Sequence, residues 1–179
     1  RAAITLLLLS LACTPLNTFF GWREALKRRR ALGLYAFFYA TLHMLIFVDL
    51  DYGLAWSLLV QTVFEKPFIL VGIITFLLLL PLAVTSFDLW KVRLGKRWKR
   101  LHRLVYFIAP LAVLHYAWSK KGNLFALQGD ILKPLLYGLM VGILLLARLP
   151  AVRRRLASGW TRIGSPRPVP SPAPEAKVE

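Results

Sequence analysis

The chain has 179 residues, of which 58% are hydrophobic, and it carries 24 Lys and Arg against 8 Asp and Glu, a formal net charge of +16. A soluble domain of this length would not contain so many long uncharged runs. Because the basic residues lie in clusters between the apolar runs, the charge indicates membrane topology and contact with anionic membrane lipid, and it argues against nucleic-acid binding.

Five apolar runs have about the length that a membrane-spanning helix needs, roughly 20 residues for a hydrocarbon core of about 30 Å. In chain order they cover residues 2–20, 31–50, 67–87, 101–118 and 131–149. The fourth run is short and begins with basic residues, whose side chains can reach back to the membrane surface. Because helices satisfy their own backbone groups in lipid, the sequence predicts an all-α, multi-pass transmembrane helix bundle.

The first run follows Arg1 directly and has no small-residue cleavage site after it, so we expect a span rather than a signal peptide. Its single cysteine, Cys13, can form no intramolecular disulfide and is expected to be a core residue. At the other end, residues 164–179 are rich in Pro and Ser and are expected to form a disordered cytoplasmic tail. We therefore divide the chain into a transmembrane domain, residues 1–163, and this tail.

Alternation of the five spans puts the basic clusters in residues 23–30, 91–103 and 148–167 on one side of the membrane. The other side carries acidic residues, among them Asp49, Asp51 and Glu65. By the positive-inside rule the basic side is cytoplasmic. The outward segment 51–66 has apolar residues at helical spacing, which predicts a short interfacial helix where an extracytoplasmic partner would dock.

The three histidines lie in or at the edge of apolar runs, where an ionisable side chain is costly and points to function. His43 follows Arg30 by about 13 residues and His115 follows Leu101 by about 14, so both lie roughly 20 Å into the membrane from the cytoplasmic side. Two neutral imidazoles at one depth can ligate a haem iron from its two faces. We predict this role for His43 and His115, against the alternative of packed, hydrogen-bonded histidines.

His102 lies near the cytoplasmic edge, within a basic segment, where a solvated interfacial histidine is the simple alternative to a second redox centre. The chain contains no glycine-rich dinucleotide fingerprint, so electrons must come from a separate donor. It also lacks a Ser, Cys or carboxylate constellation for hydrolysis. Any chemistry is therefore expected to be electron transfer.

The chain resembles the MsrQ family, also called YedZ, within the ferric-reductase-like transmembrane group. Three segments carry the resemblance: RRRALGLYAFFYATLHMLIF, KPFILVGIITFLLLLPLAVTS and RLGKRWKRLHRLVYFIAPLAVLHYAW. It covers about residues 1–150, and the positions that match the family's histidines are His43, His102 and His115.

The resemblance implies a six-helix haem b protein of the bacterial inner (plasma) membrane, with FMN as a further cofactor. Such a subunit takes electrons from the quinone pool or a flavin reductase donor. It passes them to MsrP, a periplasmic molybdopterin methionine sulfoxide reductase that repairs oxidised proteins, and is not itself that reductase. Since five spans are visible, a further helix is expected before residue 1.

The chain departs from the wider ferric-reductase group, in which two helices each carry two histidines. Positions 29 and 30, near which the second histidine of the helix that carries His43 would lie, are arginines. Only one bis-histidine haem is therefore expected, and a second haem would need His102 with another ligand. Arg29 and Arg30 are either a positive-inside anchor or bidentate partners of an FMN phosphate or haem propionate. The alternative functions are a ferric or cupric reductase with another acceptor, and a haem-free transporter or assembly subunit.

Overall fold

The computed structural model describes residues 1–120, 132–149 and 152, and in this part of the chain it contains helices and no strand. The all-α prediction is confirmed. The elements, in chain order, are α1 (Ala2–Phe20), α2 (Arg23–Ile46), the π-helix η1 (Phe47–Asp51), α3 (Trp56–Glu65), α4 (Pro67–Val84), α5 (Asp88–Leu94), α6 (Lys96–Leu101), the 3₁₀-helix η2 (His102–Leu104), α7 (Val105–Ser119) and α8 (Leu132–Leu146).

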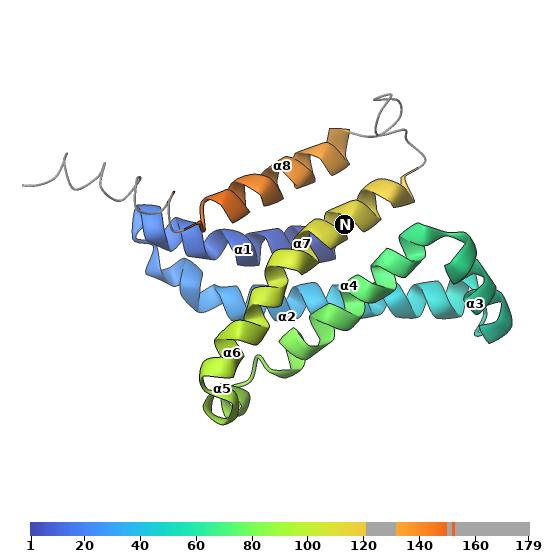
Figure 1. Cartoon of the computed structure of the whole chain (residues 1–179), viewed down its shortest axis with the longest axis horizontal. Coiled ribbons are helices and arrows are strands. Elements are labelled where there is room, and N and C mark those ends of the chain that lie inside the picture. Colours follow the sequence, from blue (N-terminus) through green and yellow to red (C-terminus); the bar gives the residue numbers. More distant parts are fainter. Residues whose placement is uncertain (121–131, 150–151, 153–179) are drawn as a thin grey trace, which may run out of the picture.

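The helices form pairs that run side by side (Figure 1). Helices α1 and α2 form an antiparallel hairpin, because Gly21 caps α1 in the left-handed region, with φ of 66°, and reverses the chain at once. Helix α4 packs against α7, and α8 lies over α1 and α7. Helices α1 and α7 lie between α8 on one side and α2 and α4 on the other.

Three of the described helical segments are long and apolar enough to cross a membrane: Ala2–Phe20, Arg23–Asp51 and Pro67–Val84. The fourth and fifth predicted spans correspond to α7 and α8, which have 15 residues each. At 1.5 Å per residue each is about 22 Å long, shorter than the hydrocarbon core. The helical course of α7 is extended toward its N-terminus by α6 and η2, which together begin at Lys96.

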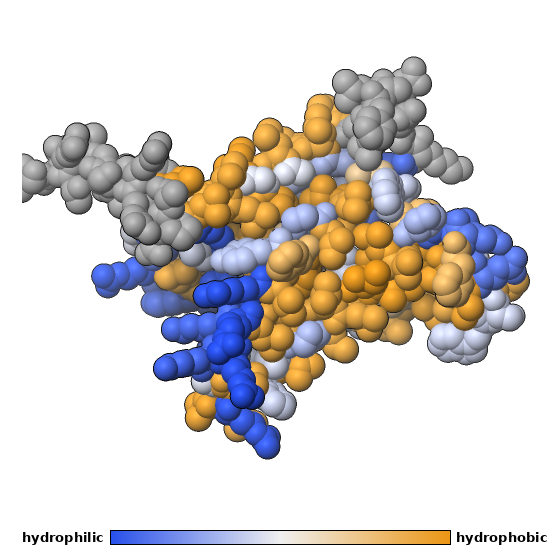
Figure 2. Space-filling model, viewed as in Figure 1, coloured by the Kyte–Doolittle hydropathy of each residue, from blue (hydrophilic) through white to orange (hydrophobic). Residues whose placement is uncertain are grey.

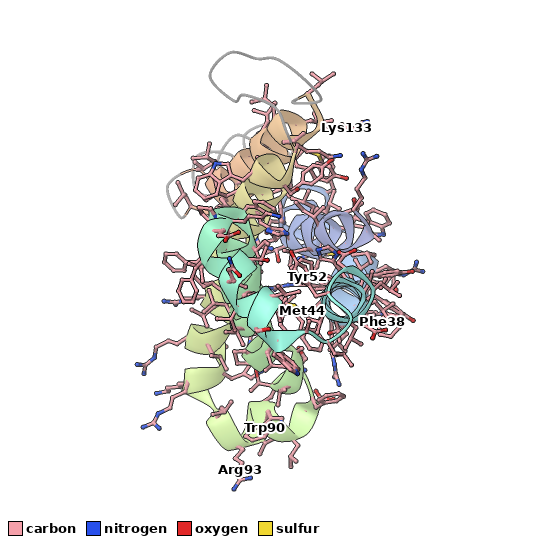
Figure 3. All side chains as sticks on the ribbon, turned by 90° about the vertical axis from the view of Figure 1, so that its right-hand side faces the viewer. Phe38, Met44, Tyr52, Trp90, Arg93 and Lys133 are labelled. Carbon is pink, nitrogen blue, oxygen red and sulfur yellow. The ribbon has the colours of Figure 1, made fainter. Side chains whose placement is uncertain are left out.

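The buried core is small and lies where α1, α2, α4, α7 and α8 meet; its most buried members are Leu8, Leu11, Ala36, Ile108 and Ala109. Large apolar side chains are exposed around it, and Figure 2 shows them as a hydrophobic band between two hydrophilic ends. Phe38, for example, is 55% exposed and points away from the bundle in Figure 3. An exposed apolar band of this kind matches the lipid-facing surface of a membrane protein.

The two ends of the molecule differ in charge. At the basic end, where α1, α4 and α8 end, α5 and α6 carry a cluster of Lys and Arg side chains that appears as a hydrophilic patch in Figure 2. Trp90 and Arg93 lie at this end, at the bottom of Figure 3, with the Arg93 guanidinium carbon 5.8 Å from the Trp90 ring centroid. The opposite end carries η1 and α3, so the segment 51–66 does contain the predicted helix. The predicted tail, residues 164–179, lies outside the described residues.

Candidate functional site

Helices α1, α2, α4 and α7 enclose a cavity of about 380 Å³, toward the end of the molecule that carries α3. This volume is in the range of small-molecule and cofactor sites, about 300–1,000 Å³. The wall is mostly apolar, and Met44 of α2 belongs to it, lying between α2 and α4 in Figure 3. Two imidazoles interrupt the apolar lining, His43 from α2 and His115 from α7.

The structure brings these two histidines together, although 72 positions separate them in the sequence. Their ring centroids are 6.2 Å apart, and the ring planes are inclined by 59°. Each helix ends near its histidine: α2 passes into the π-helix η1 four residues after His43, and α7 ends four residues after His115. Helices α2 and α7 thus each contribute one ring to the same cavity.

The ring of His115 is oriented by a hydrogen bond from outside its own helix. Its Nδ1 lies 2.7 Å from the carbonyl oxygen of Phe68 on α4. Because a carbonyl oxygen can only accept, Nδ1 must carry the proton and donate. In the neutral imidazole this leaves Nε2 with a lone pair, which is the tautomer that a metal-ligating histidine needs.

The two imidazoles suit a metal ion that brings its other ligands with it. Among the described residues, no group of three or more His, Cys, Asp and Glu side chains is placed to hold a metal ion. A metal–imidazole bond of about 2 Å places the ring centroid about 3 Å from the metal, so two rings on opposite sides of one ion have centroids roughly 6 Å apart. The observed 6.2 Å matches this spacing.

His102 lies in a second cavity, of about 230 Å³, toward the basic end. Its ring stacks on Trp98, with centroids 4.1 Å apart, and its Nδ1 lies 3.2 Å from the Trp98 carbonyl oxygen. Arg29, Arg30 and Lys91 line the same cavity. The structure thus brings together the three basic-end residues that the sequence singled out, and it separates them from the pair His43 and His115.

One carboxylate neutralises part of this positive charge. Asp88, the first residue of α5, accepts hydrogen bonds from Lys91 Nζ at 2.7 Å and from Arg30 Nη1 at 2.9 Å. These two bonds hold the pKa of the Asp88 carboxyl below its ordinary value, and the bond from Lys91 has the larger effect. The Arg30 bond joins α2 to α5 across one side of the cavity.

The two cavities share part of their walls. Leu7 of α1 and Leu79 of α4 line both of them, and both side chains are buried. The site therefore consists of an imidazole pair in an apolar cavity and a cationic cavity with one histidine, divided by aliphatic side chains.

Sequence reasoning did not identify Phe68, Gly72, Trp98 or Lys91 as parts of the site. Phe68 acts through its backbone carbonyl, which carries no side-chain signal. Gly72 is an isolated glycine within an apolar helix. This pattern indicates close packing, but it does not identify the residue that packs against the glycine. The indole Nε1–H of Trp98 donates to the Thr85 carbonyl at 2.8 Å, a contact that the sequence does not reveal.

The sequence profile of a family described as "Ferric reductase like transmembrane component" matches residues 1–113, a stretch that includes His43 and His102. The chain belongs to this ferric-reductase-like transmembrane family. Its membership agrees with the apolar helices and identifies a membrane protein. No solved structure matches the chain.

Curated relatives from several bacteria are also similar to this ferric-reductase-like chain, and they carry the name protein-methionine-sulfoxide reductase heme-binding subunit MsrQ. The chain is 46% identical to the protein of Rhodospirillum rubrum over 151 residues, 83% of this chain and 69% of that protein. It is 45% identical to that of Herminiimonas arsenicoxydans, covering 79% of this chain and 63% of that protein. It is 44% identical to the protein of Bordetella pertussis, covering 90% of this chain and 72% of that protein. The chain thus spans roughly two thirds of these relatives' length.

Proposed function

We propose that this chain is the haem-binding membrane subunit of a methionine sulfoxide reductase system, and that haem b is held between His43 and His115. The observation that carries the proposal is the separation of 6.2 Å between the two ring centroids inside an apolar cavity. The names of relatives at 44–46% identity give it independent support.

The residues around the cavity fit a haem in three respects. The two imidazole centroids have the separation that two rings on one iron would need, and the described residues offer no third metal ligand that would favour a bare ion. The wall between them is largely apolar, as the macrocycle requires. His115 is fixed by the Phe68 carbonyl in the tautomer with a free Nε2, and such a bond raises the basicity of a ligand.

When bound, the haem iron supplies one-electron redox chemistry. The chain's own residues do the rest. His43 and His115 would hold the iron, the largely apolar wall would surround the macrocycle, and the Phe68 carbonyl keeps the proton on Nδ1 of His115.

In the second cavity, we assign Arg29 and Arg30 to an FMN phosphate or a haem propionate, and His102 to a second haem or to electron entry. Support comes from their shared position: both arginines, Lys91 and His102 line one cavity, and a guanidinium binds a phosphate or carboxylate through paired hydrogen bonds. Since Asp88 already engages Arg30, Arg29 is the arginine with less competition from a carboxylate.

We assign the protein to the bacterial inner membrane with its basic end in the cytoplasm, and residues 1–163 to its haem-binding domain. Electrons then enter from the quinone pool or a flavin donor and leave at the end that carries α3. The acceptor on that side is a periplasmic molybdopterin reductase of the MsrP type, which repairs methionine sulfoxide in oxidised proteins. The positive-inside rule supports this orientation, and the names of the relatives support a methionine sulfoxide reductase as the partner.

The haem assignment is tested on the full chain, purified in detergent and reduced with dithionite. The wild-type protein should show the split α and β bands of a low-spin haem b. His43→Ala and His115→Ala should each abolish the bis-histidine spectrum, because a five-coordinate haem with one imidazole remains at best. His102→Ala should keep that spectrum at least in part. Full retention in either of the first two variants contradicts the ligand assignment.

The acceptor is tested separately, in membranes that hold the reduced protein. Reoxidation should accelerate when an MsrP-type reductase and a methionine-oxidised protein are added together, and it should not accelerate with either component alone. A ferric chelate that reoxidises the haem as fast as the complete repair system would instead support the ferric-reductase alternative. No acceleration with the complete system would contradict the repair function while leaving haem binding intact.

A further inference from the structure

Gly72 of α4 faces the imidazole of His115 at very short range. A Cβ atom added at Gly72 would lie 2.6 Å from Cε1 and 2.7 Å from Nδ1 of His115, and 3.3 Å from Nε2. Carbon atoms that are not bonded to one another pack at about 3.5–4.0 Å. The ring therefore occupies the volume that any other side chain at position 72 would need.

The same face of α4 supplies the hydrogen bond that orients this ring. Phe68 and Gly72 are four residues apart on one helix, so they lie one above the other on a single face. The Phe68 carbonyl accepts the proton of His115 Nδ1 at 2.7 Å, and the Phe68 ring centroid is 6.3 Å from that of His115. The imidazole thus rests on bare backbone at Gly72 while its Nδ1 reaches the carbonyl of the preceding turn.

Close helix packing alone does not explain Gly72, because the other helical glycines of the described residues have room for a methyl group. A Cβ at Gly33 would come no closer than 3.5 Å to a neighbouring atom, and one at Gly138 no closer than 3.6 Å, which are ordinary contacts. At Gly142 nothing lies within 4 Å. Gly72 is the position where the missing side chain is replaced by a functional ring.

We infer that Gly72 is a positioning residue for haem ligation: the absence of its Cβ lets His115 lie against α4, donate Nδ1–H to Phe68, and present Nε2 to the cavity at the level of His43. This inference rests on the proposed haem site and adds a residue to it. It also gives a reason for the ring orientation, since the slot formed by Gly72 and the Phe68 carbonyl fixes both the plane and the tautomer.

The test is Gly72→Ala in the full chain. The methyl group must displace the imidazole or push α4 away from α7, and either shift lengthens the bond from Nδ1 to Phe68. Loss of such an outer hydrogen bond typically weakens metal binding 10–100-fold. We expect haem retention at least about tenfold weaker, together with changed g values in the electron paramagnetic resonance of the ferric low-spin haem and a shifted midpoint potential.

Gly138→Ala and Gly142→Ala are matched controls, because each adds the same methyl group to an apolar helix where space exists. Both should keep wild-type haem content, g values and midpoint potential. Wild-type g values, potential and haem content in Gly72→Ala would overturn the inference while leaving the haem site standing. A wild-type chain without haem would instead refute the proposed function itself.

A second pair of variants tests the role of Gly72 if Gly72→Ala does not fold. His115→Gly removes the ring and leaves its slot, so added imidazole should restore a low-spin spectrum. In Gly72→Ala/His115→Gly the methyl group occupies part of that slot, and restoration should need at least about tenfold more imidazole. Equal imidazole requirements in the two variants would show that position 72 does not shape the ligand site, which overturns the inference.

Discussion

His115 and His102 make the same kind of hydrogen bond, from Nδ1 to a backbone carbonyl, but the two carbonyls differ in origin. His115 bonds to Phe68, which belongs to another helix, at 2.7 Å. His102 bonds to Trp98, one turn back in its own helical course, at 3.2 Å. The orientation of His115 therefore depends on how α4 packs against α7, whereas His102 combines the local bond to Trp98 with a contact to the Leu82 backbone of α4.

Asp88 allows a test of how the basic end is held together. Its pKa is lowered in the folded protein by the bonds from Lys91 and Arg30, so their contribution to stability is present above the ordinary pKa of 3.8 and is lost as the pH falls through the lowered value. We expect the amides of α5 to exchange hydrogen faster in Asp88→Asn than in the wild type at neutral pH. This difference should disappear as the pH falls through the lowered pKa of Asp88.

Glu24→Gln is the control for that measurement, because Glu24 pairs with Lys27 within α2 and, among the described residues, bonds to no second element. It should leave the exchange of α5 unchanged. Equal exchange of α5 in Asp88→Asn and wild type at neutral pH would show that the bond between Arg30 and Asp88 does not hold α5 in place.

The pairing of His43 with His115 was predictable at the residue scale, because both are rare ionisable residues in apolar runs and their depth follows from the helical rise. The role of Gly72 was not predictable. Its partner lies 43 positions away, and several glycines in apolar runs look alike in the sequence. Only the approach of α4 to α7 distinguishes the glycine that faces an imidazole.

Helices α1 and α8 are joined through a carbonyl that a proline leaves unpaired. Pro15 lies inside α1 and has no N–H, so the Leu11 carbonyl lacks its usual helical partner. Arg148, just after α8, donates Nη2–H to that carbonyl and to Thr14 Oγ1. Its guanidinium carbon also lies 5.6 Å from the ring centroid of Tyr106 on α7. One side chain thereby connects three helices.

A double-mutant cycle tests this connection. Arg148→Ala should lower the free energy of unfolding by roughly 1–3 kcal/mol, because it leaves a buried carbonyl without a partner. In a Pro15→Ala background the new N–H of residue 15 can satisfy Leu11, so the same change should cost about 1 kcal/mol less. The free energies can be measured by denaturant unfolding in mixed micelles. Additivity within about 0.5 kcal/mol would contradict the link between Pro15 and Arg148.

Each of the five apolar runs contains one main helix, in the same order (α1, α2, α4, α7 and α8), but the bounds differ for identifiable reasons. Helix α2 begins at Arg23 rather than at residue 31, because Glu, Lys and Arg favour helices while a hydropathy pattern reports only apolar residues. Helix α7 begins at Val105 because His102–Leu104 tightens into a 3₁₀ turn. Such a turn depends on packing, here of Trp98 against His102, and leaves no clear signal in the sequence.

At the scale of the whole molecule, the separation of charge between the two ends predicts its direction in the membrane. Cys13 is the single cysteine and is buried, so Cys13→Ala gives a background free of thiols. In that background, Glu65→Cys on α3 should react with a membrane-impermeant maleimide in intact spheroplasts. Lys99→Cys on α6 should react only after lysis, because the proposed orientation puts the basic end in the cytoplasm. The reverse pattern would contradict the proposed orientation.

The partition formed by Leu7 and Leu79 between the two cavities has a consequence for energy conservation. Electrons tunnel through a thin layer of saturated carbon, whereas protons move along chains of water or hydrogen-bonding groups. An aliphatic partition offers protons no such chain. In the proposed electron-transfer role, such a partition would let electrons cross between the two sites while giving protons no path across the membrane.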